Sequence, residues 1–109
     1  MLQSIFTVYD EKAKAHLQPF FMARQEQAIR SFTDCINSPE HTFSRHPEDY
    51  TLFIHGSWDD ENAAFTLQSH PKPLGNGVEY IQIPTDREIP DARSQKVSND
   101  SPLRLNPTG

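Results

Sequence analysis

Residues 46–60 constrain the fold most strongly, because they read as a strand with a marked beginning and a marked end. Residues 46–49 combine a proline with acidic side chains, a composition typical of a turn. A run rich in β-branched and aromatic residues follows at 50–56 and closes on a glycine, and the acidic residues 59–62 are typical of a hairpin turn. We therefore expect a strand at 50–56 and its return strand at 63–68.

A helix is predicted upstream of this hairpin, over residues 24–37. Its apolar residues recur at three- and four-residue spacing and form one stripe, which we expect to face the core. The helix should end before Pro39, because the residue preceding a proline is pushed out of the helical region. The members of the stripe are Ala28, Ile29, Phe32, Cys35 and Ile36.

Two further strands complete the expected sheet, at 2–9 and at 78–83, with polar loops at 40–49 and 69–77. Residues 2–9 carry apolar groups on both faces, so this strand should be central or covered on both sides. The fold class expected is α+β: a small antiparallel or mixed sheet of about four strands packed on one main helix.

The chain of 109 residues is long enough for one domain, which we place at 1–84. Prolines recur from position 84 onward, and aliphatic residues become sparse there. Residues 85–109 should therefore be a disordered C-terminal tail, because they bury too little apolar surface to offset the entropy of ordering.

The charge balance argues against tight binding to nucleic acid. Residues 1–84 hold six basic and eleven acidic residues, so they carry the whole formal net charge of −5. A basic surface that would neutralise phosphates is not apparent.

The lone cysteine, Cys35, excludes an intrachain disulfide and reads as a structural thiol. The chain carries no apolar run of membrane-spanning length, and its first residues do not resemble a secretory signal.

No catalytic constellation stands out, so we expect no enzyme activity, no catalytic residue and no cofactor. Adjacent carboxylates at 48–49 and 59–61 read as solvated turns rather than as an acid–base pair. His41 and His46 lie near Glu48 and Asp49, and His55 lies on the adjacent strand. Zinc accepts such ligands, but the spacing of His41 and His46 matches no firm ligand pattern. A turn explains them better, and we expect no metal.

Contact with nucleic acid or with a protein partner would fall to exposed basic and aromatic side chains. Single strands are held without sequence preference when bases stack on aromatic rings beside basic groups. The alternative is that the aromatic rings form the core and the arginines are merely solvated. The candidate contact residues are Arg24, Arg30, Arg45, Tyr50 and Trp58.

Several short segments, taken in order, resemble a known phage family. They are residues 5–10, 19–21, 28–32, 46–53 and 56–60. In sequence and spacing they resemble the small nonstructural protein of gokushoviruses, the single-stranded-DNA phages of the microvirus family. The resemblance covers residues 2–68 and does not extend to the tail.

The resemblance implies a nonstructural accessory protein of the bacterial cytoplasm that acts in single-stranded viral DNA synthesis or genome packaging. It would work mainly through contacts with phage replication or procapsid proteins, with weak contact to single-stranded DNA as a second contribution. The alternative is a sequence-nonspecific single-stranded-DNA-binding protein that uses the aromatics and arginines. No membrane contact is expected, and exposed sheet edges would allow a homodimer.

Overall fold

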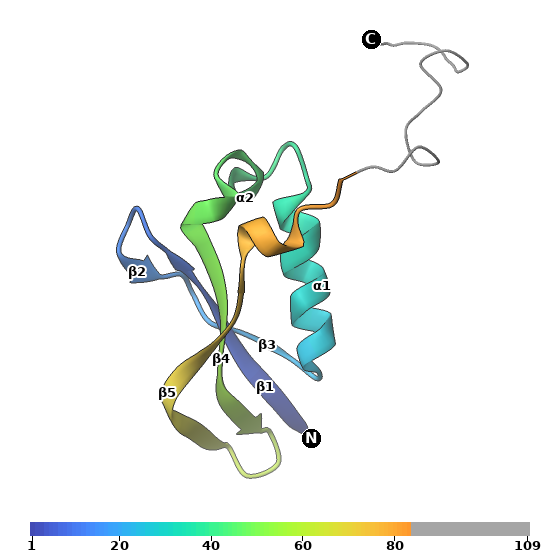
Figure 1. Ribbon diagram of the computed structural model, residues 1–109. Helices are drawn as coiled ribbons and strands as arrows, with labels where there is room; N and C mark the ends of the chain where they lie inside the picture. Colours follow the sequence, from blue (N-terminus) through green and yellow to red (C-terminus); the bar gives the residue numbers. More distant parts are fainter. Residues whose placement is uncertain (84–109) are drawn as a thin grey trace, which may run out of the picture.

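The computed structural model describes residues 1–83, and its sheet is built around the long strand β1 (Leu2–Asp10). β4 (Tyr50–Asp59) pairs with one edge of β1, and β5 (Ala64–Asn76) pairs with the far edge of β4 (Figure 1). Two short strands, β2 (Ala15–His16) and β3 (Phe20–Met22), share the other edge of β1. All pairings among the described residues are antiparallel, and the sheet is visibly curled.

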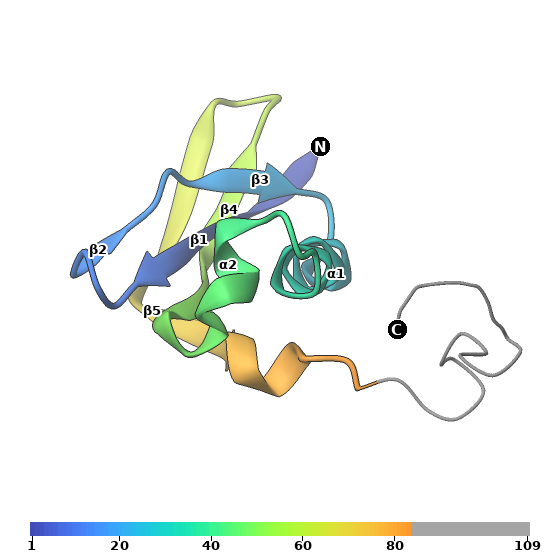
Figure 2. The same cartoon turned by 90° about the horizontal axis from the view of Figure 1, so that it is seen from above.

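One face of this sheet is covered by helices. The main helix is α1 (Gln25–Ile36), and the short α2 (Thr42–Arg45) lies beside it. Two 3₁₀ turns, η1 (Pro47–Asp49) and η2 (Gly77–Tyr80), complete this layer. Seen from above, α1, α2 and η2 all lie on the same side of β1 (Figure 2). The predicted α+β fold, an antiparallel sheet packed on one main helix, is therefore confirmed.

The hydrophobic core lies between α1 and the covered face of the sheet. The apolar stripe of α1 supplies one side of it, and alternate residues of β1 and β4 supply the other, because side chains alternate between the faces of a strand. Phe20 stacks on Phe6 from β3, with ring centroids 5.6 Å apart. The buried members of this cluster are Phe6, Val8, Ala28, Phe32, Ile36, Tyr50 and Leu52.

The opposite face of the sheet, which no described helix covers, is called the open face below. Ile5 and Thr7 lie on the open face of β1, and each is only 5% exposed. Neighbouring strands cover them, because Phe21 of β3 pairs with Ile5 and the imidazoles of His16 and His55 contact Thr7. The expectation that this strand is covered on both sides is confirmed.

The predicted strand at 2–9, helix at 24–37 and hairpin around 59–62 all form near their expected positions. The second strand runs on to Asp59, however, because Gly56 does not end it. The pairing of β4 with both neighbours shifts register next to Gly56, whose φ is 150°. Gly56 is therefore part of a bulge that lets the strand continue.

The predicted loop at 69–77 is wrong, because β5 extends through it to Asn76. Proline is tolerated there because β5 lies at the edge of the sheet, where an amide donor is not required on the outer side.

The predicted strand at 78–83 is also wrong, and its first three residues belong to η2, which begins at Gly77. The Asn76 side chain accepts a hydrogen bond from the Val78 amide at 3.0 Å, and the Asn76 amide donates to Glu79 at 3.0 Å. These reciprocal bonds favour a helical turn over the β-branched character of the sequence.

Two other stretches contain structure that the sequence did not reveal. The predicted loop at 40–49 holds α2 and η1, and His41 caps α2 by accepting a hydrogen bond from the Phe43 amide at 3.1 Å. The apolar residues Phe20–Met22 pair with β1 as a strand. The predicted disordered tail at 85–109 lies outside the described residues, and the domain boundary at 84 stays a prediction.

Candidate functional site

Three aromatic side chains form a row across the open face of the sheet. Phe21 of β3 contacts Trp58 of β4 edge-on, with ring centroids 6.5 Å apart. Trp58 in turn contacts Phe65 of β5, with centroids 4.7 Å apart. Trp58 and Phe65 are direct partners in the β4–β5 register, so they share a face. We call these three residues the aromatic row.

Two of the three rings in the aromatic row are exposed, and the third, Trp58, is half-buried. Phe21 is 41% exposed and Phe65 is 59% exposed, and Leu67, on the same face of β5, is 63% exposed. Rings of this size are favourable to bury, and each offers a large apolar contact area to another molecule. This row is the clearest candidate for a contact surface in the described part of the chain.

The charge next to the aromatic row is negative. The β4–β5 turn carries Asp59, Asp60 and Glu61, immediately after Trp58 and just before Phe65. Asp59 is tied into the turn, accepting hydrogen bonds from the Glu61 amide and the Asn62 side chain, each at 3.0 Å. A phosphate backbone approaching this end of the row would meet like charge.

The three predicted arginines lie in the helical layer instead. Arg24 immediately precedes α1, Arg30 is exposed on α1, and Arg45 is the last residue of α2. Arg30 and Arg45 are carried by helices that pack on the covered face, away from Trp58 on the open face. Arg24 lies three residues after Phe21, in the connection from β3 to α1.

The two predicted aromatic contacts have different places. Trp58 lies in the aromatic row, as a contact role requires. Tyr50 is buried in the core at 9% exposed and packs against Phe43 with centroids 4.3 Å apart. Burial, together with nearby Asp10 and Asp49, raises the pKa of its phenol. Its ring therefore supports the fold and is not part of a contact surface.

The other members of the row were not among the predicted site residues. Phe21 belongs to segment 19–21 of the family resemblance, and Phe65 belongs to the predicted return strand at 63–68. Pairing across β3, β1 and β4 places them on one face. The available signal was the alternation in the hairpin: a turn at 59–62 puts Trp58 opposite Ala63, and Phe65, two residues further on, shares that face.

A polar cluster around the buried Thr7 lies on the open face at the other end of β1, between an exposed and a half-buried histidine. Thr7 Oγ1 is 2.7 Å from His16 Nδ1 and 2.7 Å from His55 Nε2. The centroids of the two imidazole rings are 5.7 Å apart, and the ring of His16 also contacts the ring of Phe53. Burial, and secondarily the nearby His16, lowers the pKa of His55. This cluster satisfies a buried hydroxyl, and it does not match a nucleophile–base–acid arrangement.

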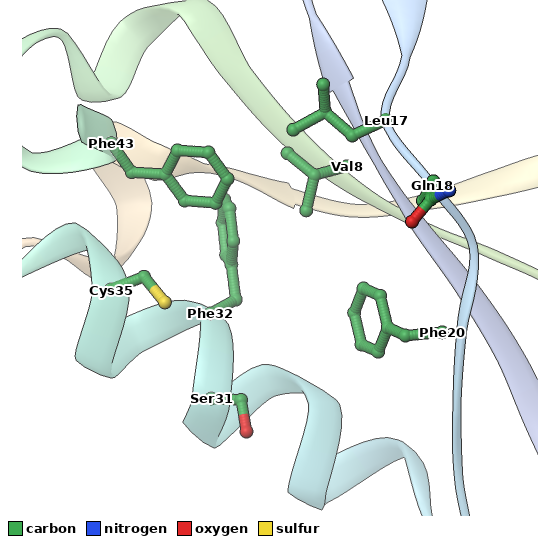
Figure 3. Close-up of a pocket in the computed structure, with 8 residues that line it drawn as sticks. All are labelled: Val8, Leu17, Gln18, Phe20, Ser31, Phe32, Cys35 and Phe43. Carbon is green, nitrogen blue, oxygen red and sulfur yellow. The ribbon is translucent and has the colours of Figure 1, made fainter. Parts of the chain in front are cut away.

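An apolar pocket of about 170 Å³ opens between the sheet and α1 (Figure 3). The thiol of Cys35 lies at its wall, and burial, with a smaller contribution from Asp34, raises the pKa of that thiol. A raised pKa keeps the sulfur protonated and weakly nucleophilic, in keeping with the structural role expected of it. The lining residues are Val8, Leu17, Gln18, Phe20, Ser31, Phe32, Cys35 and Phe43.

The histidine and acidic residues near position 46 come together in part. His46, Glu48 and Asp49 offer ligand atoms within 4.8 Å of one another. His41, in contrast, is used as the cap of α2. The remaining three groups are mostly exposed, and His46 Nδ1 lies 3.7 Å from Glu48 Oε2, as in an ordinary surface turn. The expectation of no metal stays a prediction.

Among residues 1–83, no helix combines the length and the apolar character needed to cross a bilayer.

Comparison with the curated proteins found no match, and neither did comparison with the solved structures. A family model described as Phage ORF5 protein does match, over residues 3–80. That span takes in every helix and strand described above, except for Leu2 at the start of β1. The chain therefore belongs to the Phage ORF5 protein family.

Proposed function

We propose that this chain is a nonstructural accessory protein of a single-stranded-DNA phage. It acts in the host cytoplasm, in the synthesis or packaging of the viral single strand, by contacting a phage replication or procapsid protein. It performs no covalent chemistry and needs no cofactor. Membership of a phage family supports the setting, and the resemblance to the gokushovirus nonstructural protein suggests the process.

The observation that carries the proposal is the exposed aromatic row on the open face. Interfaces between proteins are enriched in aromatic side chains at their centre, where rings become fully desolvated. The row offers such a centre, and the acidic turn beside it offers a charged rim that would favour a basic partner surface. The arginines, which a DNA site would need, lie in the helical layer.

The test is a phage genome that encodes the double variant Phe21→Ala/Trp58→Ala. Removing two rings of the row should lower the amount of single-stranded viral DNA relative to duplex viral DNA in infected cells. The matched control is Val78→Ala/Ile81→Ala, which removes two exposed apolar side chains on and just after η2, 50% and 45% exposed. Circular dichroism of both purified variants checks that they fold.

We expect a lower single-strand yield for the row variant and an unchanged yield for the control. An unchanged yield in a folded row variant would contradict a role for this face in either process. A fall that is equal in both variants would also count against it, since it would point to general loss of exposed apolar surface.

The second candidate is direct, sequence-nonspecific binding of single-stranded DNA. The observation that favours it is again the row, because successive bases stack on such rings at about 1–3 kcal/mol per base. The chain's single tryptophan lies within the row, so its fluorescence would report stacking directly.

Titration with an unlabelled oligonucleotide at low and at high salt separates the two candidates. Our proposal expects little change of Trp58 fluorescence at micromolar protein. Strong quenching that weakens steeply with added salt would instead establish the DNA-binding alternative.

A further inference from the structure

The outer edge of β5 ends the sheet without a pairing partner among residues 1–83. β5 pairs with β4 along one edge, and the strand order β2-β1-β4-β5 leaves the other edge at the boundary of the sheet (Figure 1). Residues 64–70 are all exposed. An open edge of this kind presents a row of amide and carbonyl groups that can pair with a strand of another chain.

The two halves of β5 differ in how they protect that edge. The second half contains Pro71, Lys72 and Pro73, and proline and lysine are the residues that block pairing at natural sheet edges. The first half, residues 64–69, contains no proline, no glycine and no charge. It also exposes Phe65 and Leu67 by 59% and 63%. The structure therefore leaves one section of the edge open to pairing.

We propose that residues 64–68 of β5 pair antiparallel with the same residues of a second copy of this chain. A two-fold axis brings identical patches together, so each copy both donates and accepts the same backbone hydrogen bonds. The rest of the chain is acidic, with a net charge of −5, so two copies repel over most of their surface. The segment 64–69 carries no ionisable group and lets them meet without opposing like charges.

The side chains favour a register centred on Thr66. In that register Thr66 faces Thr66 of the second copy, and each Phe65 faces Leu67 of the second copy. All four of these apolar side chains lie on the open face, because residues two apart share one face of a strand. Cross-strand pairs of an aromatic and an aliphatic side chain stabilise antiparallel sheets.

This pairing would also join the two open faces. Phe65 already contacts Trp58 in its own chain, and in the dimer it would contact Leu67 of the second copy as well. The aromatic rows of both copies would then form one continuous apolar surface across the two-fold axis. The inference goes beyond the proposed function and does not depend on it.

The first test is the mass of the full chain in solution, measured by light scattering at micromolar concentration. We expect twice the chain mass of 12.5 kDa for the native protein. Leu67→Lys puts a charge opposite Phe65 at the edge and should give the single-chain mass. The control Val78→Lys makes the same kind of change at a side chain that is 50% exposed on η2, and should remain a dimer.

A native chain of single mass would overturn the proposal, and so would a Leu67→Lys variant that keeps the double mass. Circular dichroism checks the fold of both lysine variants. Should Leu67→Lys fail to fold, the second test decides in its place.

The second test is crosslinking of Thr66→Cys in a Cys35→Ser background. Opposed residues of an antiparallel pair lie about 4.5–5.5 Å apart at Cα, within reach of a disulfide. Mild oxidation should therefore join two Thr66→Cys chains rapidly. Thr42→Cys, an exposed threonine on α2, is the matched control and should crosslink slowly. Equal and slow crosslinking of the two variants would overturn the register and the pairing together.

Discussion

At the scale of single residues, Thr7 shows how a buried polar group is accommodated in this sheet. It is 5% exposed, and its hydroxyl lies 2.7 Å from a nitrogen of each of two histidines. A hydroxyl has one proton to donate, so the histidine nitrogen that accepts it must be unprotonated. A charged His55 would carry a proton on Nε2 and could not accept a hydrogen bond from the threonine hydroxyl.

This arrangement makes stability depend on pH through His55. Burial, and then the nearby His16, lowers its pKa in the folded chain. The unfolded chain therefore binds this proton at a higher pH, near the ordinary value of about 6.5. We expect the free energy of unfolding to be constant above that value and to fall as the pH drops below it. Urea denaturation at a series of pH values measures this.

The matched variants for this prediction are His55→Gln and His70→Gln. The first removes the perturbed imidazole and should flatten the pH dependence below 6.5. His70 is exposed on β5, so its removal should leave the slope unchanged. A native-like slope in His55→Gln would show that another group is responsible.

Single residues were predicted unevenly from the sequence. The stripe of α1 gave its buried residues correctly, because helical spacing alone decides which side chains face the core. Tyr50 could not be distinguished from an exposed aromatic, since its burial depends on Phe43 from α2, an element that was not predicted. Phe21 was similarly hidden, because its place depends on pairing with β1.

At the scale of elements, the close approach of β5 to β4 depends on Gly56. A Cβ added there would lie 2.1 Å from the backbone oxygen of Thr66, and the φ of 150° is one that other residues rarely adopt. Both observations indicate that β5 approaches β4 closely at the bulge.

We expect Gly56→Ala to lower the free energy of unfolding by about 1–3 kcal/mol, from backbone strain and the clash together. Chemical denaturation followed by circular dichroism measures the loss. Ser57→Ala, at the next position of the same strand, is the control and should change stability by much less. Equal stability of the two variants would show that the strands separate easily at this point.

Elements were predicted well where local pattern and tertiary context agree. The first strand, the helix and the hairpin turn each follow from side-chain periodicity or turn composition. β5 was cut short because prolines oppose a strand in general and are tolerated at an edge, and edge position is not visible locally. η2 replaced a predicted strand because the capping bonds of Asn76 outweigh the preferences of valine, tyrosine and isoleucine.

At the scale of the whole molecule, the core and the family match both lie within residues 1–83. The last described contacts with α1 come from η2 and the residues just after it. The rings of Tyr80 and Phe32 have centroids 5.8 Å apart, and the Gln82 amide donates a hydrogen bond to Asn37 at 2.8 Å. These contacts fasten the end of the fold to α1.

We therefore expect a chain that ends at Ile83 to melt cooperatively at a temperature close to that of the full chain. A chain that ends at Asn76 should melt at a much lower temperature or not fold, because it loses Tyr80 and its hydrogen bond to Leu74 at 2.7 Å. Thermal melting followed by circular dichroism compares the three lengths. A large fall in melting temperature for the chain that ends at Ile83 would mean that residues beyond 83 contribute to the stability of the fold.

The candidate site could be predicted only in part, for a reason that belongs to the whole molecule. Trp58 was identified, but the row joins β3 to a hairpin that follows it at a distance in the sequence, and their alignment requires the pairing of β3 with β1 and of β1 with β4. The arginines were identified as cations, but their side of the molecule follows from which face α1 covers. The sequence pattern predicts neither the alignment of these strands nor the side of the molecule on which the arginines lie.

The two borders of the sheet are unequal, and this limits how large an assembly can grow. The border formed by β2 and β3 consists of strands of two and three residues, too short to template a further strand. The border formed by β5 is long. Residues 1–83 thus offer one edge long enough for the pairing proposed above, and a copy paired through it has no second such edge within these residues, so we expect sheet extension to stop at a closed pair instead of propagating into a filament.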